Sequence, residues 1–492
     1  MQALNTRRAG MLLHPTSLPG PRGCGAFGDD AYRFIDFLAA AGQTLWQMLP
    51  LGPTHANGSP YQCLSVHAGN PRLISLDRLA QWGWLDEAAR ARSEGAEAED
   101  HAEVVERARA GFLERAPAED RAAFDDFMSA QQDWLPDYAL FQALRMRYEC
   151  ADWSRWPGAL RDRDGAALEK ARRKHRAVIE RICFEQFVFH RQWGAVRAEA
   201  NRRGILILGD MPIFVAHDSV DVWVNRHLFE LDEKGHPVVV AGVPPDYFSA
   251  TGQRWGNPHY RWKLMEQDGF AWWMQRIERQ IRMFDLVRID HFRGFEAYWE
   301  IPADHPTAMG GRWVEGPGAK FFEAVLRHFG ALPFVAEDLG LITPQVHALR
   351  EQFQLPGMRI LQFAFDGGSD NPYLPHNHAR DSVVYTGTHD NDTTLGWYRG
   401  LDAQAQGRVL EYLGQPQAPM PWPLIRAALA SVANTAVIPL QDALCLGGEH
   451  RMNTPGTTQD NWRWRFTWDQ IGPDLAVRLR DMNALYGRIP PG

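Results

Sequence analysis

Cysteine is scarce in this chain of 492 residues, and its few occurrences follow no regular spacing. The five cysteines are odd in number, lie far apart and form no Cys-x-x-Cys pair: Cys24, Cys63, Cys150, Cys183 and Cys445. A disulfide framework and a structural zinc cluster both need paired or regularly spaced cysteines. The sequence therefore predicts neither.

Long hydrophobic runs and an excess of positive charge are also missing. No stretch reaches the roughly 18 apolar residues of a membrane span, and the apolar run before His14 is too short for a signal-peptide core. The formal net charge of −8 argues against a polyanionic partner. We therefore expect a cytoplasmic protein with no membrane or nucleic-acid partner.

Cofactor motifs are absent as well. No glycine-rich phosphate-binding loop follows a predicted strand, so no cofactor is expected. Tryptophan, in contrast, is abundant, with 19 residues. Aromatic faces stack on sugar rings, although most large aromatics fill protein cores. Their number is therefore only a hint of a carbohydrate ligand.

Eight short apolar runs recur along the chain and alternate with amphipathic helical patterns. The runs cover residues 11–14, 44–49, 205–210, 285–290, 333–338, 357–365, 382–387 and 435–440. Eight alternating strand and helix segments favour an α/β fold of the (β/α)8 TIM-barrel type. An open doubly wound sheet is the alternative.

Two intervals are too long for simple connections between a strand and the next helix. Residues 68–200 are predicted to form a largely helical insertion subdomain, rich in Ala, Glu and Arg near 86–120. A second insertion, 215–260, contains a Pro-, Gly- and aromatic-rich segment that suits a lid loop. We expect one catalytic barrel over 1–492, with both insertions at its C-terminal face and no C-terminal β-domain.

Three acidic residues stand at the ends of predicted strands four, five and seven. They are Asp290 in LVRIDHFRG, Glu337 in PFVAEDLG and Asp390 in VVYTGTHDN. A single acidic residue after a strand is more often a helix cap or a solvated loop residue. Three of them on one face of a barrel favour a catalytic site.

The pattern suits glycoside cleavage, which needs two carboxyl groups on either side of the scissile bond. Arg288 lies two positions before Asp290, so both side chains share one face of the strand. The guanidinium would keep Asp290 ionised, as a nucleophile requires, or the two form an ordinary structural pair. Glu337 would need a less polar setting that raises its pKa.

The polar residues around His389 and Asp390 allow two interpretations. They could bind sugar hydroxyls, or His, Asp and Asn could hold a metal ion. No HExxH or twin-histidine spacing supports a metal, so no metal is predicted.

Several motifs together resemble the amylomaltase, or 4-α-glucanotransferase, family of the α-amylase superfamily. They are SPYQ (59–62), AGNP (68–71), GDMPIFV (209–215), PPDYFSATGQRWGNPHY (244–260), RIDHFRG (288–294), AEDLG (336–340), TGTHDND (386–392) and RMNTPGT (451–457). Each motif is weak alone. Their number and their order along nearly the whole chain carry the resemblance.

The resemblance implies transfer of α-1,4-glucan segments from a maltooligosaccharide to the 4-hydroxyl of another glucan or of glucose. It implies Asp290 as nucleophile, Glu337 as general acid/base and Asp390 as the carboxylate that stabilises the transition state. The implied substrate-binding residues are Tyr61, Asp210, Trp255, Arg288 and His389. For Tyr61, Asp210 and Trp255 the alternatives are a packed turn, a cap and a loop anchor.

One segment departs from the family pattern. Residues 54–58, THANG, lack the acidic residue and the tyrosine often found there. In the family that tyrosine contributes to a second glucan-binding site, and the sequence therefore leaves the presence of such a site open.

Two other functions share most of these features. An α-1,4-glucan hydrolase would use the same three carboxylates, and only the attacking group would differ. A non-catalytic glucan-binding protein would usually lack some of them. Both remain alternatives to the transferase.

Overall fold

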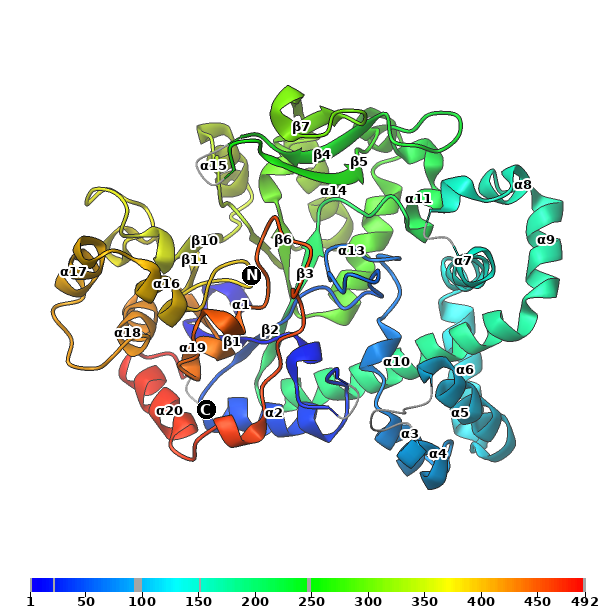
Figure 1. The fold of residues 1–492 in the computed structure, drawn as a ribbon, viewed down its shortest axis with the longest axis horizontal. Helices are drawn as coiled ribbons and strands as arrows, with labels where there is room; N and C mark the ends of the chain where they lie inside the picture. Colours follow the sequence, from blue (N-terminus) through cyan, green and yellow to red (C-terminus); the bar gives the residue numbers. More distant parts are fainter. Residues whose placement is uncertain (1, 21–22, 93–99, 150–151, 246–248, 490–492) are drawn as a thin grey trace.

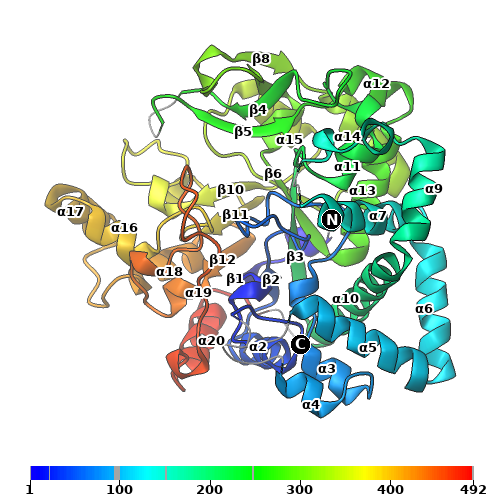
Figure 2. The same ribbon diagram turned by 45° about the vertical axis from the view of Figure 1, so that its right-hand side comes forward.

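The computed structural model describes residues 2–20, 23–92, 100–149, 152–245 and 249–489 of the chain. Cys150 and residues 246–248 of the expected lid segment lie outside the described residues. Figures 1 and 2 show the arrangement of the elements from two directions.

Eight parallel strands form the central sheet, in the order β10-β11-β12-β1-β2-β3-β6-β9. Their bounds are Arg8–Leu12 (β1), Leu45–Gln47 (β2), Leu206–Pro212 (β3), Leu286–Asp290 (β6), Phe334–Ala336 (β9), Gly357–Ile360 (β10), Ser382–Tyr385 (β11) and Thr435–Pro439 (β12). Each overlaps one of the eight predicted runs, and helices separate them along the chain. The predicted TIM barrel is confirmed, and the open sheet is wrong.

The sheet closes between its outer strands, β9 and β10. The Ala336 N–H donates to the Pro356 carbonyl oxygen at 2.8 Å. The buried carboxylate of Asp338 then accepts from the Met358 N–H at 2.7 Å and faces Arg350 and Arg359 at 3.3 and 3.4 Å. A side chain thus completes the closure where the backbone ladder is short.

Two strand boundaries differ from the apolar pattern by three residues or more. β1 begins at Arg8, three residues before the predicted run, because Arg8, Ala9 and Gly10 pair in register with Thr435, Ala436 and Val437 of β12. β10 ends at Ile360, since a turn of 3-10 helix begins at Leu361. Pairing with a neighbouring strand thus sets the first limit and the 3-10 turn sets the second, and the apolar pattern records neither.

Helices surround the barrel with their apolar faces inward. They include α2 (Asp29–Ala40), α10 (Arg176–Arg202), α13 (Ala271–Met283), α14 (Ala319–Phe329), α15 (Pro344–Gln352), α18 (Trp422–Ala430) and α20 (Leu475–Leu485). In α2 the periodic residues Phe34, Ile35 and Leu38 are buried. The left-handed Gly330 ends α14.

The interval from 68 to 200 contains helices only, among its described residues. They are α3 (Leu76–Gln81), α4 (Glu87–Arg92), α5 (His101–Arg115), α6 (Ala118–Ala130), α7 (Leu135–Tyr148), α8 (Gly158–Arg161), α9 (Gly165–Lys174) and most of α10. They stack to one side of the barrel (Figure 1). Phe112, Trp84 and Phe184 pack at the centre of this group.

A second, antiparallel sheet lies above the barrel and was not predicted from the sequence (Figure 2). Its order is β5-β4-β7-β8, with bounds Val239–Val243 (β4), Gln253–Pro258 (β5), Ala297–Pro302 (β7) and Arg312–Glu315 (β8). The segment expected as a lid loop thus contributes a strand pair, β4 and β5. The short helices α11 (Val220–Val224) and α12 (Trp262–Gln267) flank it in the chain.

The remaining helices are α1 (Gln2–Asn5), α16 (Thr394–Gly400), α17 (Ala403–Tyr412) and α19 (Leu440–Ala443). Between 440 and 489, all described, no strand follows β12. Within the described part of the chain, no helix has the length and apolar character needed to cross a membrane.

Candidate active site

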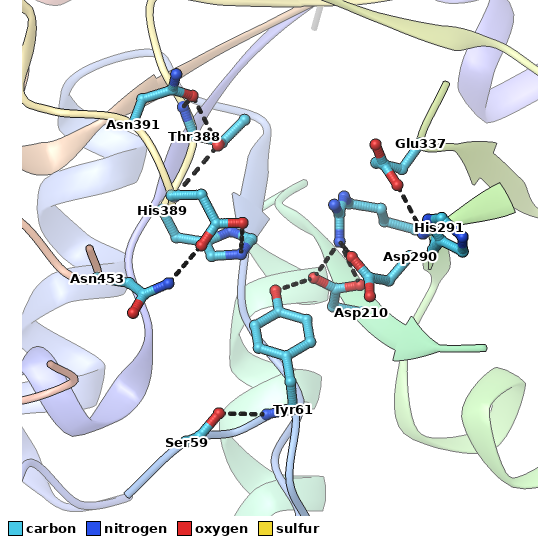
Figure 3. A network of polar contacts seen from close by, with 12 residues as sticks. Ser59, Tyr61, Asp210, Asp290, His291, Glu337, Thr388, His389, Asn391 and Asn453 are labelled. Carbon is cyan, nitrogen blue, oxygen red and sulfur yellow. Dashed lines mark hydrogen bonds and ion pairs between the residues drawn. The ribbon is translucent and has the colours of Figure 1, made fainter. Parts of the chain in front are cut away.

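The polar residues predicted to form the site meet at the C-terminal ends of the barrel strands (Figure 3). Asp210 lies in β3, Asp290 ends β6, Glu337 follows β9, and Asp390 follows β11 by five residues. Because these strands are parallel, their ends open at one face of the barrel. Two predicted residues come from elsewhere: Tyr61 lies in the loop after β2, and Trp255 comes from β5 of the upper sheet.

Arg288 is the buried centre of the site, with its side chain 4% exposed. Its Nη1 donates to both carboxylate oxygens of Asp210 at 2.8 and 2.7 Å and lies 2.9 Å from Oδ1 of Asp290. The Tyr61 hydroxyl donates to Asp210 Oδ2 at 2.7 Å. One guanidinium nitrogen therefore holds two carboxylates, and Asp210 orients Tyr61.

Asp290 and Glu337 come from paired strands. In the register of β6 and β9, Ile289 lies opposite Ala336, and the Glu337 N–H donates to the Ile289 carbonyl at 3.0 Å. The Glu337 carboxylate accepts from two backbone N–H groups, His291 at 2.6 Å and Leu339 at 3.1 Å. The two carboxyl groups thus stand side by side on neighbouring strands, as the strand count predicted.

Burial raises the pKa of both carboxyl groups, and the positive charge of Arg288 lowers both. The direct contact of Arg288 is with Asp290. Burial raises the pKa of Glu337 to about 7, and the negative charge of Asp290 adds to that effect while Arg288 opposes it. For Asp290, burial raises the pKa to about 6, against the charge of Arg288 in direct contact. Arg288 contacts Asp290 and not Glu337, and this contact favours Asp290 as the group that ionises first.

Asp390 lies across from this pair and is stabilised as an anion. Burial acts to raise its pKa, but the positive charge and hydrogen bond of His389, 3.3 Å away, and a hydrogen bond from Asn453 lower it to about 2. The Asn453 amide donates to Asp390 Oδ1 at 2.6 Å. The side chain is 49% exposed, so the charged group faces the open cleft.

Comparison with known proteins identifies the family. The family model described as 4-alpha-glucanotransferase matches residues 13–470. A 4-alpha-glucanotransferase of Thermus thermophilus is 50% identical over 491 residues, covering 97% of this chain and 98% of that protein. One from Synechocystis sp. is 48% identical, covering 99% of each.

The chain belongs to the 4-alpha-glucanotransferase family.

A solved structure agrees with this assignment. An amylomaltase from Streptococcus agalactiae, in complex with acarbose, superposes with a TM-score of 0.94 at 36% identity and covers 98% of this chain and 99% of that one. An amylomaltase from Corynebacterium glutamicum, at 18% identity and a TM-score of 0.75, shares the fold. The eight-stranded barrel is thus the fold of this family of transglycosylating enzymes.

Three aromatic rings, those of Tyr61, His389 and Trp462, lie next to one another near Asp390. The Tyr61 ring stacks on His389, with centroids 5.0 Å apart and planes at 18°. The ring centroid of Trp462 lies 5.9 Å from that of Tyr61 and 6.0 Å from that of His389. The charge of Asp390 and its hydrogen bond raise the pKa of His389 despite the opposing effect of burial.

The metal interpretation of the 388–392 segment finds little support in the geometry. Asn391 Oδ1 accepts from both the N–H and the hydroxyl of Thr388, and Asp392 Oδ1 accepts from the Thr393 N–H. These oxygens are occupied within their own turn. His389 is instead turned toward Asp390.

Two contributing residues were not among the predicted site residues. Asn453 bonds to Asp390 from the loop after β12, and Arg451 Nη2 donates to the Asp390 carbonyl oxygen at 2.9 Å. Both stand in the RMNTPGT motif, whose family resemblance was the available signal. Their hydrogen bonds to Asp390, more than 60 positions earlier in the chain, leave no recognisable pattern in the local sequence.

His291 is a third residue of the site that was not among the predicted site residues. It follows Asp290 directly in RIDHFRG, and its backbone N–H is the shorter of the two hydrogen bonds to Glu337. Its ring lies against Trp255, with centroids 4.9 Å apart and planes at 87°. Trp255, one of the predicted substrate-binding residues, is therefore linked to Glu337 through His291.

Proposed function

We propose that this 4-alpha-glucanotransferase works by a retaining double displacement, with Asp290 as nucleophile, Glu337 as general acid/base and Asp390 as the carboxylate that stabilises the transition state. The observation that carries the proposal is the pair Asp290 and Glu337 on adjacent strands, with Arg288 bound to the first alone. The donor is a maltooligosaccharide, and the acceptor is another glucan or glucose.

In the first half-reaction, Asp290 attacks the anomeric carbon of the donor sugar, and the glycosidic bond breaks. Glu337 gives its proton to the departing 4-oxygen, and a glycosyl ester forms on Asp290. The contact of Arg288 with Asp290 and the burial of Glu337 support these roles, because a nucleophile must be ionised while the acid holds its proton.

In the second half-reaction, the Glu337 carboxylate takes the proton from the 4-hydroxyl of an acceptor sugar as that oxygen attacks the ester. The acceptor oxygen bonds to the anomeric carbon, and Asp290 leaves as a carboxylate. Two inversions restore the α configuration. Glu337 is then protonated and ready for the next donor.

Asp390 and its neighbours bind the donor sugar whose anomeric carbon reacts. The low pKa of Asp390 keeps it charged through the cycle. A carboxylate that grips sugar hydroxyls stabilises the positive charge that develops on the ring in the transition state. Tyr61, Asp210 and His389 line the same subsite, and the Tyr61 ring offers a face for stacking.

Transfer in place of hydrolysis requires that a sugar reaches the glycosyl ester before water does. Trp255, on β5 above the catalytic pair, is positioned to contact the acceptor and to limit the entry of water. In this proposal the aromatic loop within the 215–260 insertion acts as a lid, and the domain division over 68–200 and 215–260 stays a prediction. So does a cytoplasmic location.

The test is a product assay with maltotriose. The wild-type enzyme should release glucose and build longer oligosaccharides, and Asp290→Asn should lose turnover because the amide cannot form the glycosyl ester. Circular dichroism of the variant should match the wild type. Glucose and maltose without longer products would favour the hydrolase, and full activity of the variant would remove Asp290 from its role.

A further inference from the structure

His291 has an unusual backbone for a residue with a side chain. Its φ of 53° and ψ of 50° place it in the left-handed region, which only a few per cent of residues other than glycine adopt. This conformation follows immediately after the nucleophile strand. It accompanies the short hydrogen bond of 2.6 Å from the His291 N–H to Glu337 Oε2.

The His291 ring is held by the upper sheet and by its own loop. Trp255 of β5 meets it edge to face, and Phe214 lies 6.2 Å away. A Cβ on Gly294 would come within 3.1 Å of the ring carbon Cδ2, so this glycine leaves room for it. Ring packing therefore fixes a residue whose backbone conformation is intrinsically unfavourable.

The imidazole has no evident role of its own in proton transfer. Its Nε2 is buried and has no hydrogen-bond partner among the described residues. Burial lowers the pKa of His291 to about 3, and the nearby positive charge of Arg293 acts in the same direction. The ring is thus a neutral packing group between Trp255 and the main chain that binds Glu337.

We propose that His291 is a positioning residue that couples the aromatic lid to the acid/base carboxyl, with its ring against Trp255 and its N–H on Glu337. This inference rests on the roles of Glu337 and Trp255 in the proposed function. When Trp255 holds the ring, the left-handed backbone is kept and the N–H stays aimed at the carboxylate. When the contact loosens, this hydrogen bond weakens.

The coupling acts on proton transfer because the hydrogen bond favours the charged form of Glu337. The other groups that face Glu337 are Arg288 and Asp290 from β6, the Leu339 N–H, and Tyr373 from the loop after β10. None of these belongs to the lid. A change at Trp255 that reaches Glu337 through His291 must therefore raise the pKa of Glu337 by loss of this hydrogen bond.

The experiment measures the alkaline limb of the pH profile of kcat/KM, normalised to its maximum, for maltotriose disproportionation. Trp255→Leu should move this limb upward by about one pH unit, since one hydrogen bond to a carboxylate is equivalent to about that much. Trp255→Phe, which keeps an aromatic ring, should leave the limb near its wild-type position. The same Trp255→Leu change in a His291→Asn background should produce no further shift.

Asparagine suits this position because it tolerates the left-handed backbone but lacks the ring that meets Trp255. An equal upward shift in both backgrounds would mean that the lid acts on Glu337 without His291, and the proposal would be wrong. A downward shift in Trp255→Leu would show that admitted water, which lowers the pKa of a buried carboxyl, dominates, and this too would overturn it. Should His291→Asn not fold, His291→Gly, which also adopts the left-handed backbone and lacks the ring, takes its place in the same comparison.

Glu337→Gln separates this inference from the proposed function. If Glu337 is the acid/base, the glutamine variant loses the alkaline limb together with most of its activity. If the limb persists in Glu337→Gln, the assignment of Glu337 fails, whatever the lid variants show. If the limb is lost but the lid variants leave it unmoved, the acid/base role stands and the coupling through His291 is refuted.

Discussion

Replacing Asp210 by Asn should move the acid limb of the pH profile to lower pH while it destabilises the fold. Asp210 and Asp290 share one nitrogen of Arg288, with contacts of 2.7 to 2.9 Å. Their nearest oxygens are therefore less than about 6 Å apart. The negative charge of Asp210 raises the pKa of Asp290, so its removal lowers that pKa.

The size of the shift follows from the separation of the two charges. Two charges about 6 Å apart interact by roughly 3 kcal/mol at an effective dielectric constant of about 20, or about two pKa units. The Asp290 side chain is 28% exposed, and solvent screening reduces this to about one unit. Activity is lost as pH falls through the pKa of Asp290, so the variant should stay active about one pH unit further into acid.

The same substitution should lower stability. Arg288 donates to both oxygens of Asp210, and in asparagine one of these becomes an amide NH2 that faces a donor. The loss of one buried, charge-assisted hydrogen bond costs about 1.5 to 3 kcal/mol. A lower midpoint of thermal unfolding should accompany the shifted limb.

Asp338→Asn supplies the matched control for this prediction. Asp338 is equally buried and paired with arginines, but it faces β10 and not Asp290. It should lower the unfolding midpoint and leave the acid limb in place. The reasoning is refuted if Asp210→Asn retains the wild-type acid limb or moves it upward, measured as kcat/KM for glucose release from maltotriose.

Two further predictions concern the other groups of the site. The wild-type profile should be a bell whose two limbs, set by the coupled pair Asp290 and Glu337, both lie above the ordinary pKa range of carboxyl groups because burial raises both pKa values; limbs within the ordinary range would contradict these shifts. Asn453→Ala should lower kcat roughly three- to tenfold with little change in the unfolding midpoint, because Asp390 loses an oriented, partly solvated hydrogen bond. Asn377→Ala, in an exposed turn with hydrogen bonds to Ser369 and Asn371, should leave kcat unchanged, and an equal loss in both variants would count against the role of Asn453.

Local pattern is sufficient to predict the barrel strands because each is a short, largely buried run between polar loops. The order of the strands then placed Asp290, Glu337 and Asp390 on the fourth, fifth and seventh, which is where the structure has them. The two-residue spacing of Arg288 and Asp290 likewise predicted that both side chains lie on one face. Their 2.9 Å contact agrees with it.

The upper sheet was not predictable in the same way. β5 includes Gly256 and Pro258 and carries no alternation of apolar residues, so its composition suggested a loop. It becomes a strand because β4 pairs with it on one side and with β7, more than 50 residues later, on the other. Strand formation at such a place depends on partners that are distant in sequence.

The sequence by itself determined the eight-stranded barrel, the acidic residues at its strand ends and the family motifs, because these depend on local periodicity and residue type. Only the tertiary structure decided which groups touch them. The Asn453 hydrogen bond to Asp390, the His291 hydrogen bond to Glu337 and the contact of Trp255 with His291 all join segments far apart in the chain. Such contacts arise when closure of the barrel brings its loops to one face, and that closure sets the proton affinities on which the chemistry depends.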